Sequence, residues 1–322
     1  MIKLDLNLSK IPLISYQPDP TKYLLTEKLK NAVEVAITLG QPLLVTGEPG
    51  TGKTQLSYKV AYDLSRNNPD FYEKPFVFNT KTTSTATDLF YLYDAIRHFH
   101  DANIRKTTGE KIPNVSNYIK MQALGKAIAL SNEKEIERKE FIQTSAAGPK
   151  SSVVLIDEID KAPRDFPNDI LDEIEKFQFE IKEAGNYKII KGENQRIIVI
   201  ITSNSEKNLP DAFLRRCVFY HIPFPGKEEL FKIVQSHLEE DSKYASDELI
   251  ERFQKIREIL TKKKPATAEL IAWLKILELE NFMIDGKVDL DNLTPGQKDI
   301  LMSSYSVLAK TWEDLEALSE DL

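Results

Sequence analysis

The sequence has only one cysteine among its 322 residues, Cys217, which excludes an internal disulfide bond. A chain without disulfides is typical of a reducing cytoplasm. The sequence also lacks any apolar run that approaches the ~20 residues of a membrane-spanning helix. Its first residues, Met1–Leu6, do not show the charged-then-apolar pattern of a secretory signal. We therefore expect a cytoplasmic protein with no membrane partner.

Patterns for metal-binding and nucleophilic sites are scarce as well. One cysteine cannot form a zinc knot, and the four histidines show no metal-ligand spacing. His98 and His100 lie two positions apart, so they would face different directions on a helix. The Gly-x-Ser-x-Gly elbow of many hydrolases is absent. The sequence therefore gives no support for a zinc enzyme or for a serine hydrolase of that type.

An excess of positive charge is missing too. The net charge is −7, which argues against a protein that binds nucleic acid over its whole surface but leaves room for a local basic patch. Charged residues make up 29% and hydrophobic residues 41%, a balance typical of a globular protein rather than a disordered one. The length allows one large domain or two modest ones.

What the sequence does contain is a glycine-rich segment between an apolar run and a helical pattern. The apolar run Pro42–Thr46 predicts a short buried strand, and Gln55–Leu64 has helical spacing. The residues between them are Gly47, Glu48, Pro49, Gly50, Thr51, Gly52, Lys53 and Thr54. A strand, a glycine loop and a helix in this order predict a phosphate-binding cradle. A turn that matches the pattern by chance is the alternative, and the flanking strand and helix argue against it.

Each part of this cradle has a physical role. The glycines let backbone N–H groups face phosphate oxygens, and the start of the helix adds a partial positive charge. Lys53 supplies a charge for the β- and γ-phosphates. The hydroxyl of Thr54 suits Mg²⁺, which prefers oxygen ligands. The segment therefore predicts binding of a nucleoside triphosphate with Mg²⁺.

Two acids follow the next apolar run. Ser152–Ile156 predicts a buried strand, and Asp157 and Glu158 come directly after it. Carboxylates in this position project from the edge of a parallel sheet where ligands bind. Asp157 can hold the shell of the magnesium ion, and Glu158 can orient or deprotonate the water that attacks the γ-phosphate. Two acids in a solvated turn are the alternative.

Polar residues also follow the most apolar run, Ile197–Ile201. Asn204 could polarise the attacking water or sense the γ-phosphate. Taken alone, an asparagine here would be interpreted as part of a turn, but its place after Asp157 and Glu158 favours a function. Further on, Arg215 and Arg216 come just before a predicted strand at Val218–Ile222. An arginine that enters a nucleotide site from outside is worth about 10³–10⁵ in rate. The distance from the glycine loop favours action on a neighbouring subunit, and a solvated pair at a helix end is the alternative.

The order of the predicted elements indicates the fold class. Strands alternate with helices as far as residue 225, and only helical patterns follow. We expect a P-loop α/β domain at 1–225, a three-layer sandwich with a parallel central sheet, and a small all-helical lid domain at 226–322. In the first domain we expect an extended lead-in at 1–24, a helix over 88–99 and an inserted polar loop at about 100–118. A helix over 119–130 and a hairpin at about 179–190 follow in the same domain. In the second domain we expect one helix over 295–318.

Taken together, these segments resemble an AAA+ ATPase. The resemblance rests on the glycine loop, Val153–Asp160 with its two acids, Thr202–Asn204 and Leu209–Cys217. Their order and spacing are most similar to the MoxR-like branch, in the clade with an insert in the second helix. The polar stretch Asp101–Asn117 lies where that insert would be. The predicted hairpin at 179–190 is similar to a further insertion before the sensor strand.

The resemblance implies a role for each residue. Lys53 and Thr54 would bind phosphate and Mg²⁺, Asp157 would hold the metal, Glu158 would be the base, and Asn204 would match the first sensor. Members of this branch usually form hexameric rings and often remodel proteins beside a partner with a von Willebrand type A domain.

Two positions are less settled by the resemblance. Arg216 aligns best with the arginine finger, and Arg215 is the reserve choice. The second sensor of the family is commonly an arginine that opens a helix of the small domain, but the corresponding region, Lys262–Leu270, contains none. Lys264 could replace it, although a lysine lacks the bidentate fork of a guanidinium.

Two other functions stay open at this point. A motor of a restriction or defence system would be stimulated by DNA or RNA and would bind it in a salt-sensitive way. A nucleotide-dependent scaffold would assemble with ATP and release little phosphate. The acidic net charge argues against the first, and the presence of Lys53, Glu158 and Asn204 argues against the second.

Overall fold

The computed structural model describes residues 18–108, 114–134, 148–205, 209–239, 242–283, 289–290 and 292–321. Most of the predicted lead-in and residues 109–113 of the predicted insert lie outside these ranges. Contacts divide the chain into two compact units. One unit contains Leu25–Gly47 and Lys53–Ile222. The other contains Glu48–Gly52 and Pro223–Leu322, together with the described end of Met1–Leu24.

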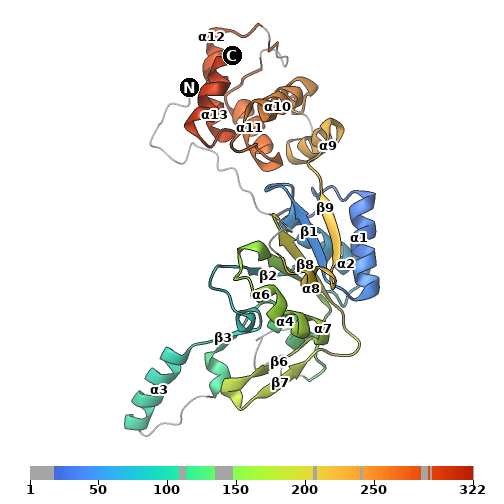
Figure 1. Ribbon diagram of the computed structural model, residues 1–322, viewed down its shortest axis with the longest axis vertical. Coiled ribbons are helices and arrows are strands. Elements are labelled where there is room, and N and C mark those ends of the chain that lie inside the picture. The colour runs from blue at the N-terminus through green and yellow to red at the C-terminus, as the bar shows by residue number, and fades with distance from the viewer. Residues whose placement is uncertain are drawn as a thin grey trace. The chain divides into compact units, whose positions relative to one another are not determined.

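A five-stranded parallel sheet forms the centre of the first unit (Figure 1). Its spatial order is β2-β5-β8-β1-β9, and each neighbouring pair is parallel. The strands are β1 (Leu43–Gly47), β2 (Phe76–Asn79), β5 (Ser152–Asp157), β8 (Ile197–Ser203) and β9 (Val218–Ile222). The apolar runs noted in the sequence correspond to β1, β5, β8 and β9, so these four strands are confirmed. The two neighbours β5 and β8 are almost completely buried, as expected for continuous apolar runs in a covered parallel sheet.

Helices pack on this sheet and complete the α/β unit. Helix α2 (Lys53–Asn67) packs on β5, α1 (Glu27–Leu39) on β9, and α4 (Ala123–Ser131) on β2 and β5. Thr26 caps α1, because its hydroxyl accepts a hydrogen bond from the Leu29 N–H. The short elements η5 (Ile159–Lys161), α6 (Phe166–Asp169), α7 (Leu171–Lys176) and α8 (Asp211–Leu214) lie between the later strands. The parallel P-loop fold expected from the sequence is therefore confirmed.

The segment after β2 differs from the prediction. Instead of one helix over 88–99, the chain forms the 3₁₀ turn η2 (Ala86–Leu89), strand β3 (Tyr91–Tyr93) and helix α3 (Ala95–Thr108). Strand β3 pairs with β4 (Ile119–Met121) in a small antiparallel sheet, so the expected helix over 119–130 begins only at α4. Tyr91, which falls off the helical face, is buried in this sheet. The apolar spacing fitted both periods, and the aromatic residues favoured the strand.

Helix α3 also replaces the first part of the loop expected at about 100–118. It continues to Thr108 and projects away from the central sheet, so it has little contact with the rest of its unit (Figure 1). A helix that is mostly exposed needs no apolar stripe, which explains why its polar sequence reads as a loop. The 3₁₀ turn η3 (Val115–Tyr118) then leads into β4.

The hairpin expected at 179–190 is confirmed. Strand β6 (Gln178–Ile181) pairs in antiparallel register with β7 (Tyr187–Ile190), and the turn η6 (Lys182–Ala184) joins them. Gly185 and Asn186 both have positive φ angles, as the tight turn requires.

The second unit is helical in the residues that the structure describes. Its helices are α9 (Lys227–His237), α10 (Asp247–Ile259), α11 (Thr267–Leu279), α12 (Pro295–Ser304) and α13 (Trp312–Glu320). Large side chains fill its core, among them Trp273, whose Nε1 donates to Ser304 Oγ over 2.8 Å. The single helix expected over 295–318 is wrong: the 3₁₀ turn η7 (Tyr305–Val307) ends α12, and the Thr311 hydroxyl caps a new helix.

None of the helices in the described part of the chain is both long and apolar enough to cross a membrane.

Candidate nucleotide site

The glycine loop joins the end of β1 to the start of α2. Gly50 and Gly52 have φ angles of 76° and 86°, a region that residues with a Cβ rarely adopt. Within the loop, Thr51 Oγ1 donates to the Glu48 carbonyl over 2.8 Å. Helix α2 begins at Lys53, so its unpaired N–H groups are at the end of the loop. The local backbone therefore has the shape of a phosphate cradle.

Lys53 is nearly buried at this position. Its side chain is 7% exposed, and its Nζ donates to the Gly47 carbonyl over 2.8 Å. A buried ammonium must be hydrogen-bonded, because removing it from water is otherwise costly. The turn of the loop thus places a positive charge beside its own backbone.

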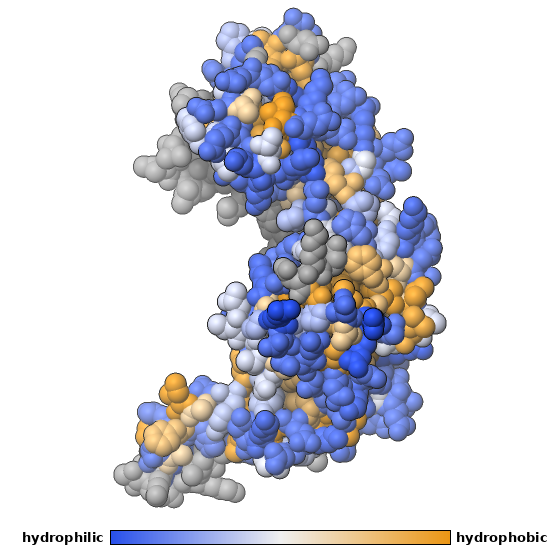
Figure 2. Space-filling model, in the orientation of Figure 1, coloured by the Kyte–Doolittle hydropathy of each residue, from blue (hydrophilic) through white to orange (hydrophobic). Residues whose placement is uncertain are grey.

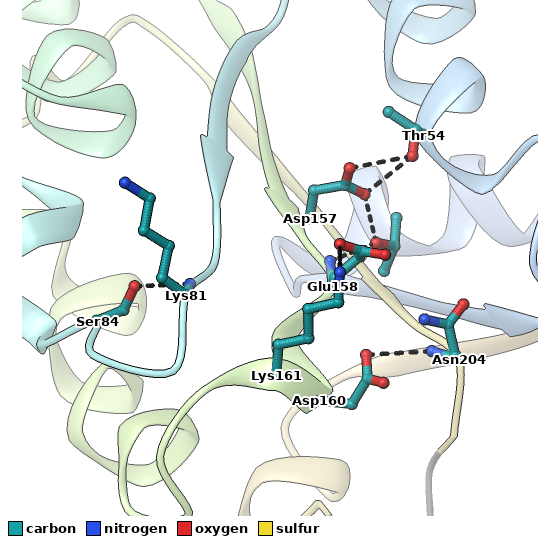
Figure 3. Close-up of polar contacts among 9 residues, drawn as sticks. Thr54, Lys81, Ser84, Asp157, Glu158, Asp160, Lys161 and Asn204 are labelled. Atoms are coloured by element: carbon teal, nitrogen blue, oxygen red, sulfur yellow. Dashed lines mark hydrogen bonds and ion pairs between the residues drawn. The ribbon is translucent and has the colours of Figure 1, made fainter.

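The structure brings Thr54 and Asp157 into direct contact (Figure 3). The hydroxyl of Thr54, in the first turn of α2, lies 3.0 Å and 3.1 Å from the two carboxylate oxygens of Asp157, the last residue of β5. The two residues come from distant parts of the sequence and meet at the carboxyl end of the parallel sheet, as expected for a ligand edge. A hydroxyl and a carboxylate at this separation form an oxygen-donor set suited to a hard cation.

Thr202, in the buried strand β8, ties the two acids together. Its Oγ1 donates to Asp157 Oδ1 over 2.6 Å and accepts a hydrogen bond from the Glu158 N–H over 2.8 Å. The side chain is completely buried. Thr202 therefore fixes both the carboxylate of Asp157 and the backbone of Glu158. Sequence reasoning passed over it as the end of an apolar strand, although the adjacent Ser203 and Asn204 marked the position.

Glu158 lies where the chain leaves the sheet. Its φ angle of 56° is uncommon for a residue other than glycine, and the hydrogen bond from its N–H to Thr202 supports it. Its carboxylate forms an ion pair with Lys161, one turn further along. The hydrogen bond between the Lys161 ammonium and the Glu158 carboxylate raises the pKa of Lys161. The charges of Glu158, Asp160 and Asp157 raise it further, by smaller amounts. One lysine thus neutralises part of a cluster of three acids.

Asn204 follows directly after β8 and is exposed. Its backbone N–H donates to Asp160 Oδ1 over 3.2 Å, which joins it to the loop that carries the acids (Figure 3). The structure therefore groups Thr54, Asp157, Glu158 and Asn204 at one edge of the sheet.

Arg215 and Arg216 are not part of this group. They follow α8, both side chains are exposed, and no hydrogen bond or ion pair joins either of them to Thr54, Asp157 or Glu158. The next residue, Cys217, is partly buried, and burial raises the pKa of its thiol to about 12. A thiol with this pKa stays protonated near neutral pH and is a poor nucleophile.

In the helical unit, the region of the expected second sensor contains an exposed Lys264. An arginine that sequence reasoning missed lies nearby. Arg257, in α10, is 9% exposed, donates to the Pro265 carbonyl and forms an ion pair with Glu48 over 2.8 Å. Only burial distinguishes it from the other charged residues of an amphipathic helix, so the sequence carried no signal for it.

A family model matches the part of the chain that carries this geometry. The family model described as "ATPase family associated with various cellular activities (AAA)" matches residues 43–225, more than half of the chain. A search of curated proteins gives no match. Among solved structures, a variant of RuvB from Thermotoga maritima has 16% identity, covers 88% of this chain and 68% of its own, and has a TM-score of 0.45. A katanin structure has 13% identity, coverages of 92% and 88%, and a TM-score of 0.41.

A parallel sheet with a glycine loop at the end of one strand and an acid pair at the end of another defines a P-loop nucleotide-binding protein. The chain belongs to the AAA family of ATPases. It binds ATP and hydrolyses it to ADP and phosphate.

Proposed function

We propose that this chain is a MoxR-like AAA+ ATPase that remodels a protein partner in the cytoplasm, works as a hexameric ring and requires Mg²⁺. Residues 1–225 form its nucleotide-binding domain and 226–322 a helical lid domain. The observation that carries this proposal is the contact of Thr54 with both carboxylate oxygens of Asp157, 3.0 Å and 3.1 Å away.

These two residues fit a magnesium ion. Both offer oxygen, the ligand that Mg²⁺ prefers, and Mg²⁺ commonly takes only one or two protein ligands besides phosphate and water. A magnesium site of this kind does not need three protein ligands. Among the described residues no group of three or more histidine, cysteine or acidic side chains could hold a metal. When bound, the ion would neutralise charge on the β- and γ-phosphates.

The chain's own residues supply the other parts of the reaction. Lys53 binds the phosphates through its buried ammonium, and Thr202 fixes the direction of Asp157. Glu158 accepts a proton from the attacking water, and Asn204 orients that water. The exposed Arg216 completes the site of a neighbouring subunit, where it stabilises the charge that develops during transfer.

The insert after β2 supports a remodelling role. Helix α3 carries Ile96 and Phe99, which are 86% and 72% exposed, and Leu92 of the neighbouring strand β3 is 45% exposed. Figure 2 shows hydrophobic side chains gathered on this projecting helix. Exposed apolar side chains on a projecting element are typical of a surface that binds another protein. The partner we propose is a protein substrate or adaptor, such as one with a von Willebrand type A domain.

A trapping experiment tests this function. The Glu158→Gln variant should bind ATP, fail to release phosphate and hold the partner. Capture with ATP but not with ADP, lost when Ile96→Ser and Phe99→Ser are added, would support remodelling through α3. The Ile104→Ser substitution changes another exposed apolar position of α3. Its effect on capture shows how far along the helix the binding surface extends.

The two alternative functions, a nucleic-acid motor and a nucleotide-dependent scaffold, predict different results for phosphate release. Phosphate release that DNA or RNA stimulates, with binding that weakens steeply as salt rises, would identify a nucleic-acid motor instead. ATP-dependent assembly with almost no phosphate release from the wild-type chain would identify a scaffold.

A further inference from the structure

Arg257 is a nearly buried charge in the helical unit whose partner comes from the glycine loop. Its guanidinium pairs with Glu48 Oε2 over 2.8 Å, donates to the Pro265 carbonyl and lies over the ring of Phe224, 3.4 Å from the ring centroid. Only 9% of the residue is exposed. A guanidinium so far removed from water is stable only with such partners.

Glu48 is the second residue of the phosphate loop and belongs to the same compact unit as Arg257. The loop also packs on the start of α11, within that unit: a Cβ placed on Gly50 would lie 2.6 Å from the Cβ of Ala266 and 3.7 Å from Glu269 Oε2. The ion pair and this close packing hold Glu48–Gly52 from two neighbouring points. The two points are adjacent, because Pro265, which accepts a hydrogen bond from Arg257, directly precedes Ala266.

The charge of Glu48 gives this contact a consequence for nucleotide binding. A carboxylate in a loop that accepts a triphosphate repels the ligand, and at Glu48, whose side chain is half exposed, water screens only part of this repulsion. Arg257 cancels this charge and fixes the direction of the carboxylate. The arginine expected at the start of α11 is absent, and Ala266 and Thr267 stand there instead. Arg257 reaches the same turn from the preceding helix.

We propose that Arg257 is a positioning residue for nucleotide binding, which neutralises and orients Glu48 so that the phosphate loop accepts the phosphates of ATP and ADP. This inference rests on the proposed role of Gly47–Thr54 in binding phosphate. In this proposal a salt bridge, rather than a second-sensor arginine, couples the phosphate loop to the helical unit.

A double-mutant cycle tests the proposal. Dissociation constants for ATP and for ADP are measured by titration calorimetry for the wild type, Arg257→Met, Glu48→Gln and the double variant. We expect Arg257→Met to weaken binding of both nucleotides about tenfold, because it removes the cation that balances the charge of Glu48. Adding Glu48→Gln should return the affinity to within about threefold of wild type, the sign of a coupled pair.

Arg252→Met is the matched control. Arg252 lies on the same helix α10, pairs with a carboxylate, Asp321, and packs on an aromatic ring, Tyr305, but none of these contacts involves the loop. Its variant should bind ATP as the wild type does. Wild-type affinity in Arg257→Met, or a loss that persists when Glu48→Gln is added, would overturn the proposal.

Two further variants keep the outcome interpretable. If Arg257→Met alone does not fold, as thermal unfolding would show, Arg257→Lys keeps a positive charge and should bind ATP more tightly than Arg257→Gln. Equal affinities in those two variants would contradict the proposal. Lys53→Ala tests the underlying assignment separately, because unchanged nucleotide affinity there would refute the phosphate cradle itself, whatever Arg257 does.

Discussion

At the scale of single residues, the site depends on side chains that the reaction never touches. Thr202 bonds Asp157 Oδ1 over 2.6 Å and the Glu158 N–H over 2.8 Å from a fully buried position. A buried hydroxyl with two such bonds has one stable orientation, so the acids it holds are fixed as well. The geometry of the acids is therefore set from β8, a neighbouring strand.

The Thr202→Val variant should lower kcat while leaving the KM for ATP nearly unchanged. The loss of a hydrogen bond to a charged group, worth about 1.5–3 kcal/mol, corresponds to roughly a ten- to hundredfold lower rate if it acts only in the transition state. Steady-state phosphate release measures both constants.

Thr202→Ser keeps the hydroxyl and should restore most of the rate. Ser131→Ala removes another completely buried hydroxyl, bound to the Ile128 carbonyl, and serves as a control that changes stability but not kcat. A KM that rises while kcat stays constant in Thr202→Val would contradict a positioning role.

The sequence pointed to the residues that we propose to face the nucleotide, but not to those that support them. The residue types and spacing that phosphate and magnesium binding require are visible in the sequence, so they predict Lys53, Thr54, Asp157 and Glu158. Thr202 and Arg257 act through burial and through partners far away in the sequence. The local sequence of Arg257 records neither property, and that of Thr202 marks its position only through the neighbouring Ser203 and Asn204.

At the scale of elements, the prediction succeeded where the apolar residues fitted only one type of secondary structure. It failed where their spacing fitted both a helix and a strand. The continuous apolar runs of β5 and β8 have no helical alternative of that length. The segment from Ala86 to Thr108 holds apolar residues at spacings that fit a helix and a strand, and only pairing with β4 decides between them. The expected helix over 88–99 includes the first residues of α3, but the hydrophobic period does not predict its continuation to Thr108, because that part of the helix buries too little.

The attachment of this insert gives a prediction at the same scale. Gly125 of α4 packs so closely on the turn before β3 that an added Cβ would lie 2.0 Å from the Phe90 carbonyl oxygen. Gly125→Ala should therefore destabilise the protein by about 1–3 kcal/mol or more, the cost of overpacking. A lower midpoint in urea denaturation would show it.

Gly296 provides the contrast, because it lies inside α12 with no atom within 4 Å of an added Cβ. Gly296→Ala should leave stability unchanged or raise it by up to about 1 kcal/mol, since alanine favours the helix. Equal midpoints for the Gly125 variant and the wild type would mean that α4 and the insert are not closely packed.

At the scale of the whole molecule, the exposed Arg216 predicts that hydrolysis depends on assembly. A chain whose finger acts on its neighbour should have a specific activity that rises with protein concentration until the ring is complete. Arg216→Ala subunits lack the finger, and Glu158→Gln subunits lack the base.

Mixing these two inactive variants should restore part of the activity. At some interfaces in a mixed ring, an intact Arg216 of one subunit meets an intact Glu158 of the next. Phosphate release from the mixture, with mixing proven by two affinity tags, measures this. Absence of restored activity in rings that are demonstrably mixed would place the action of Arg216 within one chain.

The most direct test of the account is phosphate release by wild type and Glu158→Gln in the same preparation conditions, with ATP binding measured alongside. We predict that both bind ATP with similar affinity in the presence of Mg²⁺ and that Glu158→Gln releases phosphate at least about a hundredfold more slowly, the scale of a lost general base. Glu175→Gln, at an exposed position on α7, should behave as wild type. Undiminished phosphate release by Glu158→Gln would contradict the account.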